Sequence, residues 1–300
     1  MARTNWSFKN NMCCLALLFA TTLVLAADSG ITRLTNDGHL KQRPHWSPDG
    51  QVVVFAKHQS DTIQLYLRDL TSGREERLTS HQAPEYDAVF SPDGTSLLFS
   101  FDKLSPNQGD IDVYRIDLAD RKLTPQATTQ AALSHEESPC WSPDGKQFAF
   151  TSTHPGNQEL YVANLAGSDW LRLTNDSAID AHPSWSPDGK TIAFATNRWG
   201  DLEIGLINPD GSNLRRLTHS KGLDDYPAWS PDGRRLAFTS NRDGNLEIYI
   251  QSLNASAINV TRDDAIDNFP TWITNDRIGF VSNRNDGFDL YSVSLSAAKE

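Results

Sequence analysis

The sequence predicts an all-β protein, a six-bladed β-propeller of four-stranded antiparallel blades. The tetrapeptide Ser-Pro-Asp-Gly occurs five times, each time directly after an aromatic residue, and a sixth aromatic stands where the next copy is due. These aromatic residues recur every 43 to 51 residues, and short apolar segments lie between them. A fixed period of this size is typical of propellers with one blade per repeat. The six aromatics are Trp46, Phe90, Trp141, Trp185, Trp229 and Trp272.

Each repeat contains four short strand patterns in a constant order. The first is Pro-x-Trp, and the second is an apolar triplet that ends in Phe, such as 192–194. The third combines an acidic or amide residue, an aliphatic residue and usually Tyr, and the fourth is Arg-Leu-Thr or a close variant. Between the first two strands, Ser-Pro-Asp-Gly has the composition of a hairpin turn, because Pro fixes φ and Gly accepts positive φ. The recurrent Trp is large enough to fill the wedge between blades.

The two ends of the chain are expected to share one blade. The chain begins with a fourth-strand pattern at 31–35 and ends after a third-strand pattern at 289–291. Six strands of each type are present only if the N-terminal strand completes the last blade, which closes the ring and removes an exposed edge. We therefore predict a single propeller domain over residues 27–300.

Residues 1–26 have the features of a secretory signal peptide. Arg3 and Lys9 precede an uncharged apolar run, and small residues stand at the expected cleavage site. The run is short for a membrane span, so we predict a periplasmic or secreted protein with no stable membrane anchor after cleavage. The net charge of −11 becomes more negative on cleavage and argues against nucleic acid as a partner. Cys140 is then the single remaining cysteine.

The repeat spacing fails in one stretch, between Phe90 and Trp141. Two insertions are predicted there, at 101–110 and 125–136, the second counted from Leu123 as the fourth-strand leucine. Both belong to loops of the upper face, which joins strand two to three and strand four to the next blade. Loops longer than the scaffold needs are candidates for function. We expect a rim or partial lid there, with neutral insertional drift as the alternative.

A charged position recurs five residues before each blade aromatic. We expect these side chains to surround the upper mouth of the channel, where carboxylates repel one another unless a cation compensates. Such a ring suits a metal ion such as calcium, a peptide amino terminus or a basic side chain, although no cofactor is otherwise predicted. The residues are Lys41, Glu85, Glu136, Asp180, Asp224 and Asp267.

The alternative for this ring is structural. Arg198, Arg242 and Arg284 recur after the second strand and are placed to pair with the acids, and Asp can cap loop backbone. Trp199 follows one of these arginines, where the sibling repeats have Asp243 and Asn285. An indole in an upper-face loop serves either packing or the binding of a peptide or sugar.

Signatures of common enzymes are missing from the sequence. There is no Gly-x-Ser-x-Gly, His-Glu-x-x-His, Walker-type or dinucleotide-binding motif. His45 and His182 nevertheless precede blade Trp residues and stand near the channel, so a channel-sited enzyme remains an alternative. Propeller enzymes assemble their sites from separate blades, which makes missing motifs weak evidence.

The repeats resemble the WD-like propeller repeats of the TolB family. The resemblance is carried by units such as 224–233, Asp-Asp-Tyr-Pro-Ala-Trp-Ser-Pro-Asp-Gly, followed by 236–242, Leu-Ala-Phe-Thr-Ser-Asn-Arg. It implies a periplasmic propeller of the Tol-Pal envelope system that binds partner proteins. TolB has a further α/β domain before its propeller, and we expect a stand-alone propeller here. Similar repeats also occur in peptidases of the prolyl-oligopeptidase type and in lyases of pectic oligosaccharides.

We therefore expect a non-enzymatic periplasmic or secreted propeller that binds a protein or peptide, such as a cell-envelope protein. Its predicted binding residues lie at the upper face and channel mouth, and they are Glu85, Glu136, Asp180, Asp224, Asp267, Arg198, Trp199, Arg242 and Arg284. The alternative is a metal-dependent lyase or hydrolase that acts on carbohydrate in the channel.

Overall fold

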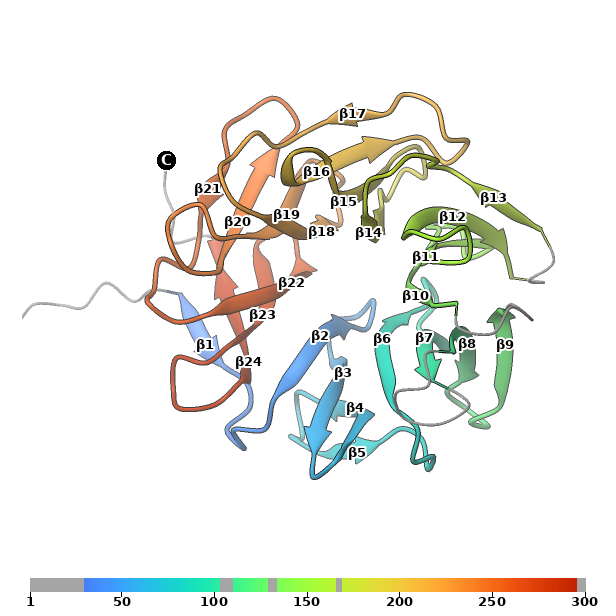
Figure 1. Ribbon diagram of the computed structural model, residues 1–300. Coiled ribbons are helices and arrows are strands. Elements are labelled where there is room, and N and C mark those ends of the chain that lie inside the picture. The colour runs from blue at the N-terminus through green and yellow to red at the C-terminus, as the bar shows by residue number, and fades with distance from the viewer. Residues whose placement is uncertain (1–29, 103–109, 129–133, 166–168, 296–300) are drawn as a thin grey trace, which may run out of the picture.

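Six four-stranded antiparallel sheets surround a central channel in the computed structural model (Figure 1). The structure describes residues 30–102, 110–128, 134–165 and 169–295. This arrangement confirms the predicted six-bladed β-propeller. The described residues form strands and turns, and no helix among them is long and apolar enough to cross a bilayer. The predicted signal peptide at 1–26 lies outside the described residues.

Each blade follows the predicted strand order from the channel outward. Blade 1 contains β2 (Lys41–Trp46), β3 (Val52–Gln59), β4 (Thr62–Asp69) and β5 (Glu75–Arg77), and blade 2 contains β6 (Glu85–Phe90), β7 (Ser96–Asp102), β8 (Ile111–Asp117) and β9 (Leu123–Ala127). Blade 3 contains β10 (Glu136–Trp141), β11 (Gln147–Ser152), β12 (Glu159–Asn164) and β13 (Trp170–Arg172), and blade 4 contains β14 (Asp180–Trp185), β15 (Ile192–Trp199), β16 (Asp201–Ile207) and β17 (Arg215–Arg216). Blade 5 contains β18 (Asp224–Trp229), β19 (Arg235–Ser240), β20 (Glu247–Ser252) and β21 (Ile258–Asn259), and blade 6 contains β22 (Asp267–Thr274), β23 (Arg277–Ser282), β24 (Asp289–Ser294) and β1 (Ile31–Arg33).

The sixth blade confirms the predicted closure of the ring. Strand β1 pairs antiparallel with β24, with Ile31 opposite Val293 and Arg33 opposite Tyr291. Arg33 Nη2 forms an ion pair of 2.6 Å with the buried carboxylate of Asp289. Thr35 Oγ1 donates to the same carboxylate at 2.6 Å. The N-terminal strand is therefore fixed by side chains as well as by the ladder.

The same contacts explain the Arg-Leu-Thr pattern of the other blades. In blade 4, Arg216 pairs with buried Glu203 at 2.6 Å, and Thr218 Oγ1 donates to that carboxylate at 2.5 Å. Thr218 Oγ1 also accepts the backbone N–H of Ile204 at 2.8 Å. The motif thus ties the outermost strand to the third strand and neutralises a carboxylate that burial would otherwise disfavour.

The Ser-Pro-Asp-Gly segments form tight turns as expected. In blade 2, Asp93 Oδ1 accepts from Ser91 Oγ at 2.6 Å and from the N–H of Thr95 at 3.0 Å. These hydrogen bonds lower the pKa of Asp93 to about 2. Gly94 has φ of +71°, a conformation that suits glycine. The turn is thus held by its own side chains.

The core lies between neighbouring blades rather than inside each one. Trp46 packs in one cluster with Val53 and Phe55 of its own blade and with Val281 and Leu290 of blade 6. A Cβ atom at Gly279 would lie 2.0 Å from the indole of Trp46, so glycine makes room for the ring. The blade aromatics therefore fill the inter-blade wedge, as the sequence predicts.

Blade 2 corrects one detail of the repeat alignment. Tyr114 pairs with Pro125, whereas the equivalent Tyr66 of blade 1 pairs with Arg77. The position of the fourth-strand leucine, opposite the residue before the Tyr, is therefore taken by Ala127, which pairs with Val113, and not by Leu123. A register shift between Val113 and Tyr114 accompanies this change.

The two predicted insertions, at 101–110 and 125–136, fall largely on residues 103–109 and 129–133, which lie outside the described residues. Their described ends meet, because Ile111 forms an isolated parallel bridge with His135. The insertions therefore start and end side by side between blades 2 and 3. Their predicted role as a rim or lid stays a prediction.

Deleting residues 30–36 is expected to lower the stability of the whole ring, because it removes the β1 ladder and the contacts of Arg33 and Thr35 with Asp289. A loss of roughly 3–6 kcal/mol follows from the hydrogen bonds removed. Urea denaturation measures it, and a synthetic peptide covering residues 27–37 should restore part of the loss. A deletion variant with the parent's midpoint would contradict the closure.

Candidate functional site

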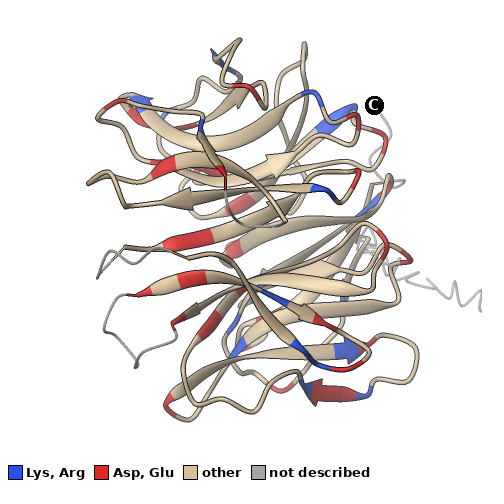
Figure 2. Cartoon of the chain, turned by 90° about the vertical axis from the view of Figure 1, so that its right-hand side faces the viewer, with Lys and Arg blue, Asp and Glu red and all other residues tan. Residues whose placement is uncertain are grey.

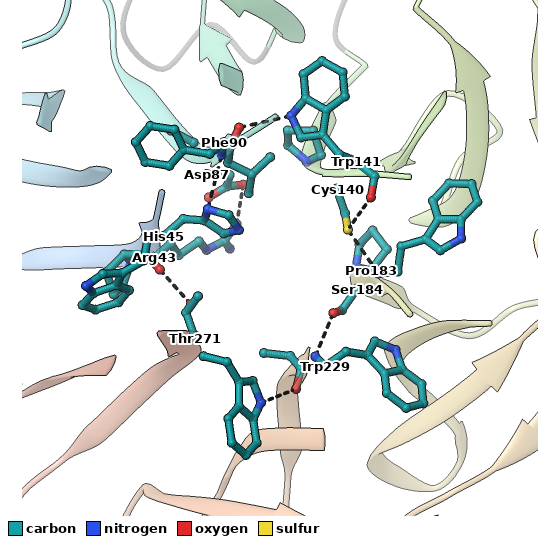
Figure 3. Close-up of a pocket in the computed structure, with 18 of the residues that line it drawn as sticks. Arg43, His45, Asp87, Phe90, Cys140, Trp141, Pro183, Ser184, Trp229 and Thr271 are labelled. Carbon is teal, nitrogen blue, oxygen red and sulfur yellow. Dashed lines mark hydrogen bonds and ion pairs between the residues drawn. The ribbon is translucent and has the colours of Figure 1, made fainter. Parts of the chain in front are cut away.

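A cavity of about 590 Å³ occupies the channel between the Ser-Pro-Asp-Gly turns and the middle of the first strands. All six first strands line it, together with the Ser-Pro-Asp-Gly turns of blades 1 to 5. Figure 3 shows the lining side chains arranged around this opening. The turns are therefore part of the candidate site, although the sequence pointed to the opposite face of the propeller.

The end of the cavity away from the turns is formed by one residue from each blade, and we call these six residues the waist. Each waist residue lies three positions before the blade aromatic and has a φ between 46° and 58°. At the same point, each first strand shifts its register against the second strand. Bulges of this kind redirect a side chain, here into the channel. The waist consists of Arg43, Asp87, Ser138, His182, Tyr226 and Phe269.

Arg43 reaches across the channel from blade 1. Its guanidinium forms an ion pair with Asp87 of blade 2 and donates to Ser138 Oγ of blade 3 at 3.0 Å. Its Nη2 lies 3.0 Å from Nε2 of His182 in blade 4, and its Cζ lies 5.3 Å from the ring centre of Tyr226 in blade 5. One side chain thus contacts the waist residues of four other blades.

The protonation of His182 follows from its two neighbours. Arginine can only donate, so Nε2 of His182 must accept from Arg43. Nδ1 then carries the hydrogen and donates to Asp225 Oδ1 at 2.6 Å. The imidazole stacks on Tyr226 with 4.1 Å between ring centres, and Tyr226 meets Phe269 edge-on at 4.6 Å. The waist is therefore polar on the side of blades 1–3 and aromatic on the side of blades 4–6.

Hydrogen bonds between neighbouring blades join the residues that form the wall of the cavity. Most of these bonds are drawn as dashed lines in Figure 3. At three junctions, a side chain next to the blade aromatic accepts the backbone N–H of the following blade's aromatic. The donor and acceptor pairs are Phe90 N to His45 Nδ1 at 3.2 Å, Trp185 N to Cys140 Sγ at 3.2 Å, and Trp229 N to Ser184 Oγ at 3.3 Å.

The other three junctions use different atoms of the same positions. Where the wall residue is Val89 or Ala228, its carbonyl accepts the indole N–H of Trp141 at 3.2 Å or of Trp272 at 3.0 Å. At the last junction, Thr271 Oγ1 donates to the carbonyl of Pro44 at 2.8 Å. Each of the six wall positions therefore makes one hydrogen bond to the next blade.

Burial also changes two pKa values in this wall. It lowers the pKa of His45 to about 4 and raises the pKa of Cys140 to about 11. The imidazole of His45 is therefore uncharged at neutral pH, and Cys140 holds its proton, which makes the sulfur a weak nucleophile.

The predicted acidic ring lies inside the blades. The six residues from Lys41 to Asp267 that form it have no exposed surface, and none lines the cavity. In blades 4 to 6 the acids pair with the predicted arginines: Asp180 with Arg198 at 2.7 Å, Asp224 with Arg242 at 2.8 Å, and Asp267 with Arg284 at 2.5 Å.

These arginines also pack on aromatic rings of their own blades, for example Arg242 at 4.6 Å from the ring centre of Tyr249. Arg198 additionally pairs with Asp176, in the loop that arrives from blade 3, at 3.0 Å. Figure 2 shows charged residues concentrated at strand ends and in loops. The pairs hold the upper face together, and a binding role for them stays a prediction.

The remaining predicted site residues have other partners. Glu85 accepts from Thr79 Oγ1 and from the N–H of Leu65, and burial raises its pKa. Glu136 accepts from Ser152 Oγ at 2.7 Å and Ser134 Oγ at 3.2 Å, because His154 stands where blades 4 to 6 have arginine. Trp199 is half-buried between Arg198 and Arg216, whose Cζ atoms lie 5.8 and 5.6 Å from its ring.

Of the waist residues, His182 alone was a candidate from the sequence. Arg43, Asp87, Ser138, Tyr226 and Phe269 were missed, because they differ in type and match no motif. One signal was available: this repeat position varies widely and carries mostly polar or aromatic chemistry, whereas the proline and aromatic after it recur.

No group of three or more His, Cys, Asp or Glu in the described part of the chain is placed to hold a metal ion. Calcium binding at the channel mouth stays a prediction.

Glu136→Gln is expected to stabilise the protein at alkaline pH. Burial raises the pKa of Glu136 to about 7 from 4.5, so the folded state binds this proton more tightly than the unfolded chain. Its contribution is fully present below about pH 4.5 and is lost as the pH rises through about 7. The variant should gain on the order of 2 kcal/mol over the parent at pH 8 and little at pH 4.5.

Urea denaturation at both pH values measures this, with Asp180→Asn as the matched control. That variant should lose stability at pH 8, because it leaves Arg198 without its buried partner. An equal effect of Glu136→Gln at both pH values would contradict the titration.

Comparison with known proteins identifies the family of this chain. A family model described as TolB beta propeller domain matches residues 24–134 and 124–226. A Protein TolB homolog from Chlorobium chlorochromatii is 32% identical over 132 residues, which are 44% of this chain and 28% of that protein. The Tol-Pal system protein TolB from Francisella tularensis is 36% identical over 122 residues, 41% of this chain and 27% of that protein. The matches thus span under a third of these two relatives.

Solved structures show the same fold. TolB from Acinetobacter baumannii superposes with a TM-score of 0.69 at 24% identity, over 79% of this chain and 58% of that one. An oligogalacturonate lyase in complex with manganese superposes with a TM-score of 0.63 at 18% identity, over 90% of this chain and 94% of that one. At these identities the likeness concerns the fold alone. The family match extends over more than half of the sequence, and the chain therefore belongs to the TolB β-propeller domain family.

Proposed function

We propose that this chain is a non-enzymatic propeller of the cell envelope that holds a segment of a partner protein in its central cavity. The observation that carries the proposal is the cavity itself. All six blades line it, and the waist closes the end away from the turns. Its volume of about 590 Å³ falls in the range of ligand-binding pockets. The site proposed on this basis lies at the turn face, opposite the upper face that the sequence favoured.

The comparisons support an envelope role. One relative is named as a protein of the Tol-Pal system, and that name supports a protein as the ligand here. Location in the periplasm, or secretion, rests on the predicted signal peptide at 1–26. The upper-face acids and arginines are occupied with one another, which favours the cavity over the upper face as the binding site.

The alternative is a metal-dependent lyase or hydrolase, which the fold of the oligogalacturonate lyase keeps open. At the waist, the groups suited to acid-base chemistry are engaged with one another: His182 lies between Arg43 and Asp225, and Asp87 is paired with Arg43. This arrangement favours binding over catalysis.

Filling the cavity is expected to abolish partner binding. Ala228 lines the cavity and its carbonyl makes the inter-blade bond, so Ala228→Trp adds bulk without removing that bond. Ala255 lies in an exposed turn, and Ala255→Trp is the matched control. A photo-crosslinking amino acid at Ile273, on the cavity rim, should capture a discrete envelope protein in cells of the native host.

The adduct should fall at least tenfold with Ala228→Trp and persist with Ala255→Trp. Persistence with both would place binding elsewhere and overturn the proposal. Release of unsaturated uronate from oligogalacturonate in the presence of manganese would instead establish the lyase.

A further inference from the structure

The cavity has a charge balance unlike that of the whole chain. Among the described residues that line it, Arg43 and Asp87 are the charged ones, and they pair with each other. The chain as a whole carries a net charge of −11. The negative charge of the chain would thus attract a cation to the surface but not into the cavity. A charged group that entered the cavity would lose its hydration without meeting an unpaired opposite charge.

The walls offer little to a polar ligand. His45 Nδ1, Cys140 Sγ, Ser184 Oγ and Thr271 Oγ1 each form a hydrogen bond to the next blade. Prolines form much of the remaining lining and have no N–H to donate. These are Pro44, Pro139, Pro183, Pro227 and Pro270 in the strands, and Pro48, Pro92, Pro143, Pro187 and Pro231 in the turns. The walls therefore reward apolar contact.

The charged hydrogen-bond donor among the described residues of the cavity is Arg43, at the waist. Arg43 has five N–H groups, and its side chain is 27% exposed. The carboxylate of Asp87 already accepts from Arg43 and from both the N–H and the hydroxyl of Ser138. Nε2 of His182 is used as an acceptor. A ligand that reaches the waist therefore meets guanidinium N–H groups and suits them with an oxygen acceptor.

We propose that the cavity receives the uncharged tip of a partner loop, with an apolar side chain against the walls and one carbonyl or amide oxygen that accepts from Arg43. A carboxylate fits less well, because Asp87 lies beside the guanidinium and repels it. A cation fits less well, because Asp87 is neutralised and Arg43 faces the ligand. Arg43 is then the residue that determines specificity. This inference rests on the proposed function and adds the chemical class of the ligand.

Three probes that share one apolar body test the proposal. They are N-acetyltryptophanamide, which is neutral, N-acetyltryptophan, which is anionic, and tryptophanamide, which is cationic. Ligand-observed NMR titration against the full chain should rank the neutral probe at least fivefold tighter than the other two. Ala228→Trp should abolish this binding, which locates it in the cavity.

Arg43→Met provides the second measurement. It should weaken the neutral probe about tenfold, the effect of one hydrogen bond from a charged donor. The cationic probe should become the tightest of the three, because Asp87 loses its partner. Arg235→Met is the matched control, since Arg235 is 25% exposed, packs on Trp272 and does not line the cavity. It should leave the ranking unchanged.

Each other result overturns the inference. The anionic probe as tightest binder would make the waist an anion site, and the cationic probe as tightest on the parent chain would make it a cation site. No binding of any probe would refute the uncharged class. Should Arg43→Met fail to fold, the ranking on the parent still decides, and Arg43→Lys, which lacks the guanidinium fork, should weaken the neutral probe. A site-dependent adduct at Ile273 together with a failed ranking would leave the proposed function standing and remove this inference alone.

Discussion

Six inter-blade hydrogen bonds, one at each junction of neighbouring first strands, are the constraint on which the channel depends. Each joins a position beside one blade's aromatic to the next blade. At three junctions the backbone N–H of that next aromatic, Phe90, Trp185 or Trp229, is the donor. At two of these junctions the buried indole Nε1 atoms of Trp185 and Trp229 have no hydrogen-bond partner, and the same holds for Nε1 of Trp46 at the closing junction. The ring is therefore closed at the expense of some indole hydrogen bonds.

The same bonds determine what the cavity can offer. A serine or histidine on a channel wall would ordinarily be available to a ligand, but here Ser184 and His45 are committed to structure. At the waist, where the bulged residues project inward, Arg43 brings charged donors into the channel. The residues that join the blades and the waist residues thus lie two positions apart on each first strand.

The fold was predictable because its determinants repeat. Trp46 and its equivalents, the turn glycines and the Arg-Leu-Thr triplets occur in phase, and the two chain ends supply complementary strands. The register of blade 2 was not predictable, because Leu123 matches the motif while Ala127 occupies the structural position. Which residue takes this position depends on how β9 pairs with β8, and the local sequence does not determine that pairing.

The site was predicted only in part. Asp180 and Arg198 were expected either to bind a ligand or to pair, and they do pair. The waist escaped notice because its backbone lies in the left-handed region without glycine: Arg43 and Tyr226 adopt φ of 46° and 53°. Such a conformation is imposed by the surrounding sheet and has no sequence signature. Nothing in the order of residues indicates that a bulge turns these side chains toward one another.

The left-handed bulge has a consequence for how such propellers diverge. Because the inter-blade bonds and the aromatic wedges set the backbone at each waist position, arginine, aspartate, serine, histidine, tyrosine and phenylalanine all occupy equivalent places in one molecule. The scaffold already tolerates six unlike side chains at one geometric point. Because the six positions are equivalent around the ring, the ligand preference of such a propeller can change by substitution of single waist residues. The blades that hold these side chains then stay unchanged.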